Sequence, residues 1–479
     1  MNILNDVLAE FAQIANIPRP SGHEQKISDY LYHCFLAIGC QVIQDEKLNI
    51  IADKPASPGC EQAPMTILQG HMDMVCIAHR GVVYEPCLDA IHLKQDAKYL
   101  MAEGTSLGAD DGIGLAEILY IFKHAEVHGP LRAICTVDEE GAMTGAVHLA
   151  SQHLEDAAFL INCDSEDFSE LTIGSAGFGN IDFYRKVNWK KPLLHKAWKI
   201  SVQGLLGGHS GEKIGSGRGN AIHILAILLW KLKERHIPFE ISYLNAGKAR
   251  NAIPETAEAI ILMDIAKDEF LHILNTEKEF ASQIYGTADP NLNFQLTEAE
   301  LPPAVFSSAD ADKALQLLTA LHTGVFALAQ EIPGTIETSA NLGTLRTDGT
   351  GISLQYLPRS SVDLKIIEFG MMARALAEMT GFQVHVGTPS PGWREHKKSM
   401  LVKIMTEVFL KQQGTPLKVS SIHAALECGW HACKQSKLDM VSTGATTLNI
   451  HTPEERLLLA DIVPHMEFLL ETLRRIAKL

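Results

Sequence analysis

The chain has 479 residues, a formal net charge of −16, and 46% hydrophobic and 20% charged residues. This length exceeds what a single hydrophobic core supports, so it predicts two or three domains, and the composition excludes an intrinsically disordered protein. The acidic balance, without any basic cluster, argues against nucleic acid as a partner. It is compatible with a protein that binds cations.

Cysteine usage and hydropathy indicate a cellular compartment. Nine cysteines are scattered along the chain and none forms a C-x-x-C pair, which indicates reduced thiols. Residues 1–17 carry Asp6 and Glu10 and lack a basic start, so they do not form a signal peptide. The longest apolar stretch, Ala221–Trp230, is too short to cross a bilayer. We therefore expect a cytoplasmic protein with no membrane partner.

The first expected elements lead to a short polar motif. Apolar residues at helical spacing predict a helix over residues 3–14, and Ser21 with Glu24 is the expected capping box of a second helix. Strands are expected over residues 42–52 and 66–69, with the motif directly after the second of them.

That motif is Gly70-His71-Met72-Asp73. His71 and Asp73 point the same way off the end of the expected strand. A metal-bound imidazole needs its second nitrogen held by an acceptor, which a nearby carboxylate supplies. Alone, the triplet is common and carries little weight. It gains weight because similar arrangements recur downstream.

Acidic residues or a histidine follow three further strand-like runs. Residues 132–137 lead to Asp138-Glu139-Glu140, residues 157–162 to Cys163-Asp164, and residues 446–450 to His451. Gly108-Ala109-Asp110-Asp111-Gly112 opens a helix over residues 113–125, where a carboxylate also suits the helix N-terminus. Each of these features alone also fits an ordinary polar turn.

Together these features predict a metal site. Strands that alternate with helices predict a parallel, doubly wound sheet, in which ligands bind at the carboxyl ends of the strands. The residues expected at that edge are His71, Asp110, Glu139, Glu140, Asp164 and His451. Two histidines and several carboxylates form a donor set of the kind that zinc uses.

The middle of the chain has a different, α+β pattern. The expected strands cover residues 197–202, 239–244, 259–265, 292–295, 342–345, 352–357 and 382–386, and the expected helices cover 220–234, 267–285, 311–330 and 371–379. We therefore expect an α/β domain with a doubly wound, mixed and mainly parallel sheet, formed by residues 1–184 and 389–479. An inserted α+β domain occupies residues 185–388.

The insertion holds weaker candidates for a site. Gly207-Gly208-His209-Ser210-Gly211 places glycines around a histidine, which allows close approach of the backbone to a ligand but also fits an ordinary turn. Asn251 and Arg359 each also fit a plain surface position.

Taken in order, these motifs resemble the di-zinc aminopeptidase/carboxypeptidase-like family of dipeptidases and deacylases. The matching segments are Gly70–Asp73, Gly108–Gly112, Asp138–Glu140, Asn162–Asp164, Gly207–Gly211 and His451–Glu454. Three others, Asn16–Ser21, Ser421–Gly429 and Pro391–Trp393, are similar to its bacterial aminoacyl-histidine dipeptidase branch, which is also called cytosolic non-specific or β-alanyl-histidine dipeptidase. The resemblance covers essentially the whole chain.

The resemblance implies two divalent metal ions, with Zn²⁺ as the first choice and Mn²⁺ or Co²⁺ as alternatives. The implied ligands are His71 and Asp164 for one ion, Glu140 and His451 for the other, and Asp110 as the bridge. Asp73 would orient His71, and Glu139 would act as the general base. The peptide bond between Asp110 and Asp111 is expected to be cis.

The resemblance also gives the insertion a role as a lid and dimerisation domain, so a homodimer is expected. There His209 would stabilise the oxyanion, while Asn251 and Arg359 would hold the carboxylate of a small peptide substrate. Two positions depart from the branch: Asp111 where asparagine is frequent, and Ala425 where glycine is common. Asp111 would add charge beside the metal ions and alter metal preference.

The implied activity is metal-dependent hydrolysis of dipeptides, including Xaa-His and β-alanyl-histidine. The alternatives on the same site are an N-acyl-amino-acid deacylase or a tripeptidase, which residues at the metal ions cannot separate. A non-catalytic metal-binding protein is disfavoured because Glu139 is intact. A structural zinc site is disfavoured because it would use cysteine ligands.

Overall fold

Eight strands form the central sheet of the larger of two units in this computed structural model, which describes residues 2–330, 332–396 and 398–479. In spatial order these strands are β1 (Gln41–Gln44), β2 (Ile50–Lys54), β6 (Leu131–Thr136), β3 (Met65–His71), β7 (Ala157–Asn162), β24 (Asp439–Ser442), β8 (Glu170–Ser175) and β23 (Lys418–Ile422). The neighbours β6, β3, β7 and β24 run parallel, while β1, β2 and β8 pair antiparallel. The sheet is therefore mixed with a parallel centre, which confirms the expected fold class.

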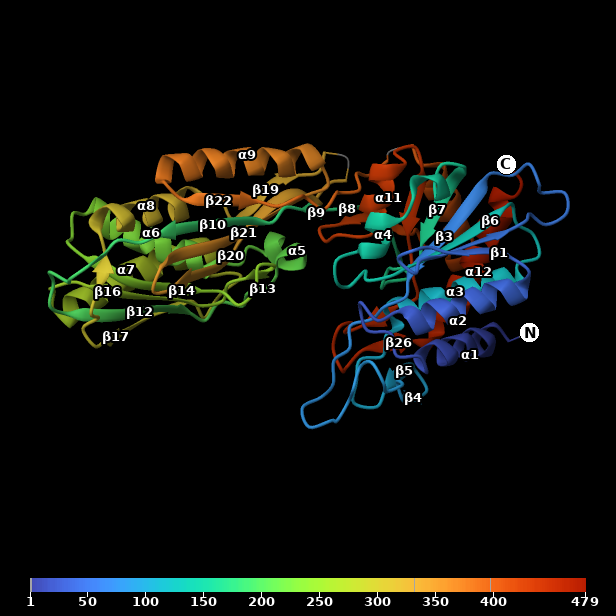
Figure 1. Ribbon diagram of the computed structural model, residues 1–479, viewed down its shortest axis with the longest axis horizontal. Helices are drawn as coiled ribbons and strands as arrows, with labels where there is room; N and C mark the ends of the chain where they lie inside the picture. The colour runs from blue at the N-terminus through green and yellow to red at the C-terminus, as the bar shows by residue number, and fades with distance from the viewer. Residues whose placement is uncertain (1, 331, 397) are drawn as a thin grey trace. The chain divides into compact units, whose positions relative to one another are not determined.

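Helices cover both faces of this sheet, so its central strands are buried, and every residue of β6 is buried. The helices are α1 (Ile3–Ala15), α2 (Gln25–Ile38), α3 (Ala109–His124), α4 (Thr144–His148), α10 (Met400–Gln413), α11 (Cys428–Lys434) and α12 (Leu459–Ile476). Within this unit, α1, α2 and α3 lie on one side of the sheet, and α4 and α11 lie on the other (Figure 1). The larger unit comprises Met1–Gly174, Trp393–Ser421 and Leu426–Leu479.

A separate four-stranded sheet in the same unit carries His451. Its order is β25 (Thr447–Leu448), β26 (Arg456–Leu458), β5 (Tyr99–Ala102) and β4 (Leu93–Gln95). The expectation that residues 446–450 form a strand of the parallel sheet is therefore wrong. Asn449 and His451 have φ of 56° and 58°, which ends β25 after two residues, and β25 pairs antiparallel with β26. The strand of the central sheet in this region is β24.

The smaller unit, Ser175–Gly392 with Ile422–Ala425, is built on an antiparallel sheet. Its main order is β17 (Asn293–Glu298), β12 (Ala197–Gln203), β16 (Ala257–Leu262), β14 (Glu240–Ala246), β20 (Ile336–Thr347), β21 (Gly351–Ser360), β10 (Ile181–Lys186) and β22 (Gln383–Val386). Two further strands lie beside this path, β19 (Gly324–Leu328) on β20 and β9 (Gly177–Phe178) on β21. The expected boundary at residue 184 falls inside β10.

Helices α6 (Ala221–Glu234), α7 (Lys267–Tyr285), α8 (Ser308–Ala320) and α9 (Asp363–Thr380) pack against this sheet. β12 alternates in burial because one of its faces meets these helices and the other is more accessible, whereas the middle of β20 is buried on both faces. Short pieces complete the unit: β11 (Trp189–Lys190) with β18 (Val305–Phe306), β13 (Gly208–His209) with β15 (Ala252–Ile253), and α5 (Ser210–Lys213).

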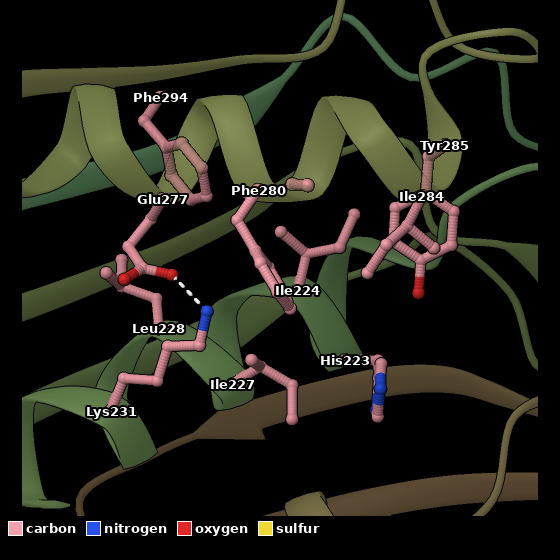
Figure 2. A pocket seen from close by; sticks show the side chains of 11 residues that line it. His223, Ile224, Ile227, Leu228, Lys231, Glu277, Phe280, Ile284, Tyr285 and Phe294 are labelled. Atoms are coloured by element: carbon pink, nitrogen blue, oxygen red, sulfur yellow. Dashed lines mark hydrogen bonds and ion pairs between the residues drawn. The ribbon is translucent and has the colours of Figure 1, made fainter.

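An apolar pocket of about 250 Å³ lies between α6 and α7 of the smaller unit (Figure 2). Ile224, Phe280 and Ile284 are among the side chains that line it, and Lys231 at its rim forms an ion pair of 2.6 Å with Glu277. None of the expected site residues lines this pocket.

Most expected elements are present, and two further local expectations are wrong. The bounds of β7 and α7 match those expected from the sequence. The helix expected over residues 311–330 ends at Ala320, because residues 324–328 pair with β20 as β19. Ser21 does not cap α2; its hydroxyl donates to Asp73 instead. The nine cysteines are free thiols, and none of the described helices is long and apolar enough to cross a bilayer.

Candidate metal centre

The carboxyl ends of three parallel strands bring the expected ligands to one edge of the central sheet. In register, His71 at the end of β3 lies opposite Thr136 at the end of β6, and Gln69 lies opposite Asn162 at the end of β7. The chain continues from β6 into Glu139 and Glu140, and from β7 into Asp164. Parallel pairing thus places residues far apart in sequence side by side.

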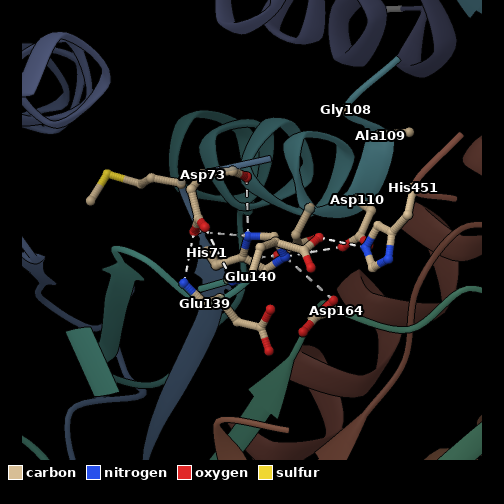
Figure 3. A network of polar contacts seen from close by, with 12 residues as sticks. His71, Asp73, Gly108, Ala109, Asp110, Glu139, Glu140, Asp164 and His451 are labelled. Carbon is tan, nitrogen blue, oxygen red and sulfur yellow. Dashed lines mark hydrogen bonds and ion pairs between the residues drawn. The ribbon is translucent and has the colours of Figure 1, made fainter. Parts of the chain in front are cut away.

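Asp110 lies between His71 and His451 (Figure 3). It follows Gly108 at the start of α3, where Asp110 and Asp111 depart from helical geometry and the peptide bond between them is cis. One carboxylate oxygen of Asp110 lies 3.0 Å from His71 Nε2, and the other lies 3.1 Å from His451 Nε2. Asp110 therefore faces both histidines, as a bridging ligand would.

The remaining carboxylates complete a group around each histidine. Asp164 Oδ1 lies 3.6 Å from His71 Nε2, and Glu140 Oε1 lies 2.6 Å from His451 Nε2. Donor atoms within 4.8 Å of one another form the sets His71–Asp110–Asp164, Asp110–Glu140–His451 and His71–Glu139–Glu140. Two of these sets share Asp110.

Asp73 is held by donors on several sides. Its carboxylate accepts hydrogen bonds from Ser21 Oγ at 2.7 Å and from the backbone N–H groups of Glu139 and Glu140 at 2.9 and 3.1 Å. It also faces His71 Nδ1 at 3.4 Å. Burial would raise the pKa of Asp73, but His71, Ser21 and the Glu139 N–H lower it to about 2. An ionised Asp73 is suited to fixing the orientation of the His71 ring.

The pKa values show how much negative charge is concentrated here. Burial raises the pKa of Glu139, of Glu140 and of Asp164, and repulsion from a neighbouring carboxylate raises each further, that of Asp164 on Glu139 and that of Asp110 on the other two. Burial would lower the pKa of His71, but Asp164, Asp110 and Asp73 raise it well above its ordinary value. Burial likewise opposes protonation of His451, whereas Asp110 and Glu140 raise its pKa to about 11.

These donors fit divalent cations. Imidazolium protons balance the carboxylates in the hydrogen-bonded cluster, and cations would balance them through the same nitrogen and oxygen atoms. Imidazole and carboxylate ligands without thiolate suit catalytic zinc and also manganese or cobalt. His451 is the most accessible member, with 43% of its side chain exposed, whereas only 1% of His71 is exposed.

Glu139 is the candidate general base of the cluster. Its backbone is fixed through Asp73, while its carboxylate lies on the Asp164 side of the cluster (Figure 3). Its pKa is raised by burial and by the neighbouring charge of Asp164. A carboxylate in this setting holds a proton more readily than an exposed one, which suits a general base.

The three candidates of the insertion all lie in the smaller unit and near one another. Arg359, on β21, approaches His209 Nε2 through Nη2 at 3.5 Å, and the N–H of Ser210 donates to the carbonyl of Asn251 at 2.8 Å. Arg359 is 6% exposed, and burial lowers its pKa to about 10. A buried guanidinium of this kind favours an anionic partner.

Sequence reasoning missed several supporting residues. Arg19 and Glu455 bind the backbone around Asp110, and Glu427 accepts hydrogen bonds from Gln69 and Thr136 below the cluster. Arg19 lies in a segment that carried the family resemblance, but its partners are remote in sequence and no spacing rule identifies them.

Asp111 was expected to add charge beside the metal ions. It belongs to none of the three donor sets and accepts a hydrogen bond from the backbone N–H of His71 at 3.2 Å. Burial, reinforced by Asp110, raises the pKa of Asp111 well above its ordinary value, which favours the neutral acid over the charged form. Its effect on metal preference stays a prediction.

A parallel-centred α/β sheet with overlapping histidine–carboxylate groups that share one aspartate is an arrangement that suits two-metal hydrolases. Comparison with known proteins agrees. The sequence pattern described as Peptidase family M20/M25/M40 matches residues 67–475, so the chain belongs to this family of peptidases.

Similar proteins cover nearly the whole chain. The cytosol non-specific dipeptidase of Escherichia coli K12 is 32% identical over 471 residues, which are 97% of this chain and 96% of that protein. The crystal structure of aminoacylhistidine dipeptidase from Vibrio alginolyticus superposes with a TM-score of 0.90 at 29% identity, over 98% of this chain and 96% of that one. A tripeptidase from Staphylococcus aureus shares the fold, with a TM-score of 0.58 at 18% identity over 99% of both chains.

Proposed function

We propose that this protein is a two-metal dipeptidase that hydrolyses unblocked dipeptides, including Xaa-His and β-alanyl-histidine. The observation that carries the proposal is Asp110, whose two carboxylate oxygens face His71 and His451. The names of the Escherichia coli and Vibrio alginolyticus relatives, a non-specific dipeptidase and an aminoacylhistidine dipeptidase, support the choice of substrate.

Each residue of the site has its own role in the proposed reaction. The proposed ligands are His71 and Asp164 for one cation, Glu140 and His451 for the other, and Asp110 for both. Two divalent cations, Zn²⁺ as the first choice and Mn²⁺ or Co²⁺ as alternatives, would acidify a water molecule and polarise the peptide carbonyl. Glu139 takes the proton of the attacking water and passes it to the leaving amine, while Asp73 holds the His71 ring.

The smaller unit supplies substrate recognition in this proposal. Arg359 and Asn251 bind the carboxylate of the dipeptide, and His209 stabilises the developing oxyanion. Support comes from the buried guanidinium of Arg359, whose pKa is lowered to about 10 by burial. Ionic pairing with a substrate carboxylate would satisfy it.

Two alternatives use the same metal centre, an N-acyl-amino-acid deacylase and a tripeptidase. Both would keep the metal ligands and Glu139, and they differ only in what the recognition residues accept. A free carboxylate is common to all of these substrates, so Arg359 does not separate them. We place the dipeptidase first because the two full-length relatives at 32% and 29% identity bear that name, whereas the tripeptidase is 18% identical.

We also propose that the protein is a cytoplasmic homodimer that associates through the smaller unit. The free cysteines favour a reducing compartment, and the Escherichia coli relative is named a cytosol enzyme. The proposed contact surface is the exposed apolar side of α9.

The decisive experiment is hydrolysis of four substrates before and after chelation and Zn²⁺ readdition. They are β-alanyl-histidine, an ordinary α-dipeptide, a tripeptide and an N-acetyl amino acid. We expect cleavage of the dipeptides, loss of activity on chelation and recovery with Zn²⁺. Cleavage of the N-acetyl amino acid alone would overturn the proposal.

The Glu139→Gln variant tests the role of Glu139. It should keep its metal content yet lose roughly 10²- to 10⁴-fold in kcat, the usual contribution of general acid–base catalysis. Glu126→Gln, at an exposed position of the same unit, is the matched control and should keep full activity. Undiminished turnover in metal-loaded Glu139→Gln would remove Glu139 from the mechanism.

A further inference from the structure

Glu455 accepts hydrogen bonds from the backbone of the segment that leads to Asp110. Its Oε2 accepts hydrogen bonds from the N–H groups of Leu107 and Gly108 at 2.7 and 2.9 Å, and its Oε1 accepts those of Ala109 and Asp110 at 2.8 and 3.3 Å. The residue is only 2% exposed. Four consecutive N–H groups thus converge on one buried carboxylate, which fixes both the path and the orientation of this segment.

Arg19 holds the same segment through its carbonyl groups. Its Nη2 donates to the carbonyl of Gly108 at 2.5 Å, and its Nη1 donates to those of Met72 and Asp73 at 2.9 and 2.8 Å. The residue is 1% exposed. Gly108 permits this approach, because a Cβ at that position would lie 2.7 Å from Arg19 Nη2.

Arg19 and Glu455, which together we call the clasp, link three segments that carry the proposed metal ligands. Arg19 joins the segment after His71 to the segment before Asp110. Glu455 joins the Asp110 segment to the turn of His451, in which the Glu455 N–H donates to the Thr452 carbonyl at 3.2 Å. All of these side-chain hydrogen bonds go to backbone groups, so the pair acts on the ligands through the main chain.

Arg19 and Glu455 carry opposite charges in a buried setting. A buried guanidinium and a buried carboxylate are each costly alone. Burial lowers the pKa of Arg19, and nearby negative groups, Glu455 among them, oppose that shift. Glutamine at position 455 would present an amide N–H₂ to backbone N–H donors, so it would lose acceptors and add repulsion while preserving size.

We propose that Glu455 and Arg19 are positioning residues that set Asp110 between His71 and His451 and thereby couple the binding of the two metal ions. The proposal rests on the two-metal function argued above. Because one turn carries both His451 and Glu455, ordering of this turn by the ion at His451 also orders Asp110 for the other ion. Binding of the ions is therefore cooperative, and it loses this cooperativity when the clasp is broken.

The test is a titration of the metal-free, full-length protein with Zn²⁺ against a competing chelator, together with the visible absorption spectrum of the Co²⁺-loaded form. In Glu455→Gln we expect the second ion to bind 10- to 100-fold more weakly, the range typical of groups that support metal ligands. We also expect an altered Co²⁺ spectrum. Glu454→Gln on the same turn is the matched control, because Glu454 is exposed and should leave both measurements unchanged.

A residue that only caps α3 would behave differently. Its loss would lower the melting temperature of the metal-free protein and leave the ion affinities and the Co²⁺ spectrum intact. If Glu455→Gln does not fold, Glu455→Asp and Arg19→Lys replace it, and each should weaken the second ion by a smaller factor. Variants that bind two ions with wild-type affinity and spectrum overturn the proposal, as does a wild type that binds a single ion. Failure of the proposed function would instead appear as a wild type that binds two ions but cleaves no dipeptide.

Discussion

At the scale of single residues, His71 is fixed from several directions. Its Nδ1 meets the Asp73 carbonyl at 3.1 Å, and its backbone N–H donates to Asp111 Oδ2 at 3.2 Å. Its remaining nitrogen faces Asp110. The position of the ring is therefore set by the backbone as well as by the side chains. A substitution that shifts these neighbours should alter metal binding at His71.

Gly70→Ala tests this dependence. A Cβ at Gly70 would overlap Asp111 Oδ2, so Asp111 must shift and the hydrogen bond to the His71 N–H must lengthen. We expect a loss of about 1–3 kcal/mol in the free energy of unfolding, measured in urea, together with weaker Zn²⁺ binding. Gly349→Ala is the control, because nothing lies within 4 Å of its added Cβ. Wild-type stability and affinity in Gly70→Ala would show that Asp111 can move freely.

At the scale of elements, a buried polar chain ties the ends of three strands together. Asn162 Nδ2 of β7 donates to Gln69 Oε1 of β3 at 2.7 Å. Gln69 Nε2 and Thr136 Oγ1 of β6 both donate to Glu427 Oε2 at 2.6 Å. The strands that carry His71, Glu139 and Asp164 are thus held by side chains as well as by the sheet.

Glu427 makes this network of buried side chains sensitive to pH. Burial raises its pKa from 4.5 to about 7. Below about pH 4.5 the carboxyl group is protonated in both the folded and the unfolded state. As pH rises towards 7, ionisation favours the unfolded state, so the free energy of unfolding falls. In the metal-free protein the free energy of unfolding is therefore lower by on the order of 3 kcal/mol above pH 7 than below pH 4.5.

Glu427→Gln should remove that dependence, because the amide oxygen still accepts from Gln69 and Thr136. We expect the melting temperature of the metal-free variant to exceed that of wild type by more at pH 8 than at pH 5. The exposed Glu126→Gln variant should follow wild type at both pH values. An equal difference at the two pH values would mean that Glu427 is already ionised at pH 5.

The sequence predicted elements well where local periodicity decides them. The limits of α7 and β7 came directly from apolar spacing flanked by polar residues. The failures arise from tertiary pairing: residues 324–328 read as the continuation of a helix but form β19, and residues 447–448 belong to a separate small sheet. Pairing partners that are remote in sequence leave no local signal.

The site shows the same division. Motifs at strand ends and at the start of α3 predicted the candidate ligands that the structure brings together. The contacts of Arg19 and Glu455 instead span 89 residues from Arg19 to Gly108 and 345 from Asp110 to Glu455. Glu455 looks like one acidic residue among several in its segment. Only folding distinguishes it from Glu454, whose side chain is 60% exposed.

At the scale of the whole molecule, the smaller unit presents an apolar surface that the fold leaves uncovered. On α9 the exposed large apolar side chains are Leu364, Ile367, Met371, Met372 and Met379, with 74%, 48%, 57%, 39% and 72% exposure. The buried side of the helix packs on β21 and β22. Phe326 of the neighbouring β19 contacts Phe369 of α9 and extends the surface.

A second copy of this chain is the partner that we expect on this surface. Among the described strands, β19 pairs only with β20, so it is an edge strand beside an apolar helix, and such edges are usually covered. A two-fold contact would bring α9 and β19 of each copy together and bury these apolar side chains, whereas a lone monomer would leave them in water.

The double variant Leu364→Glu/Met371→Glu should therefore convert the dimer to a monomer. Both positions are exposed, so the charges disturb the contact without entering the core, and light scattering after gel filtration should give about the chain mass of 52.5 kDa instead of twice that value. Ile284→Glu, at the 56% exposed rim of the pocket between α6 and α7, is the control and should remain dimeric. If Ile284→Glu dissociates the protein and the α9 variant does not, the contact lies at that pocket. A monomeric wild type would refute the dimer altogether.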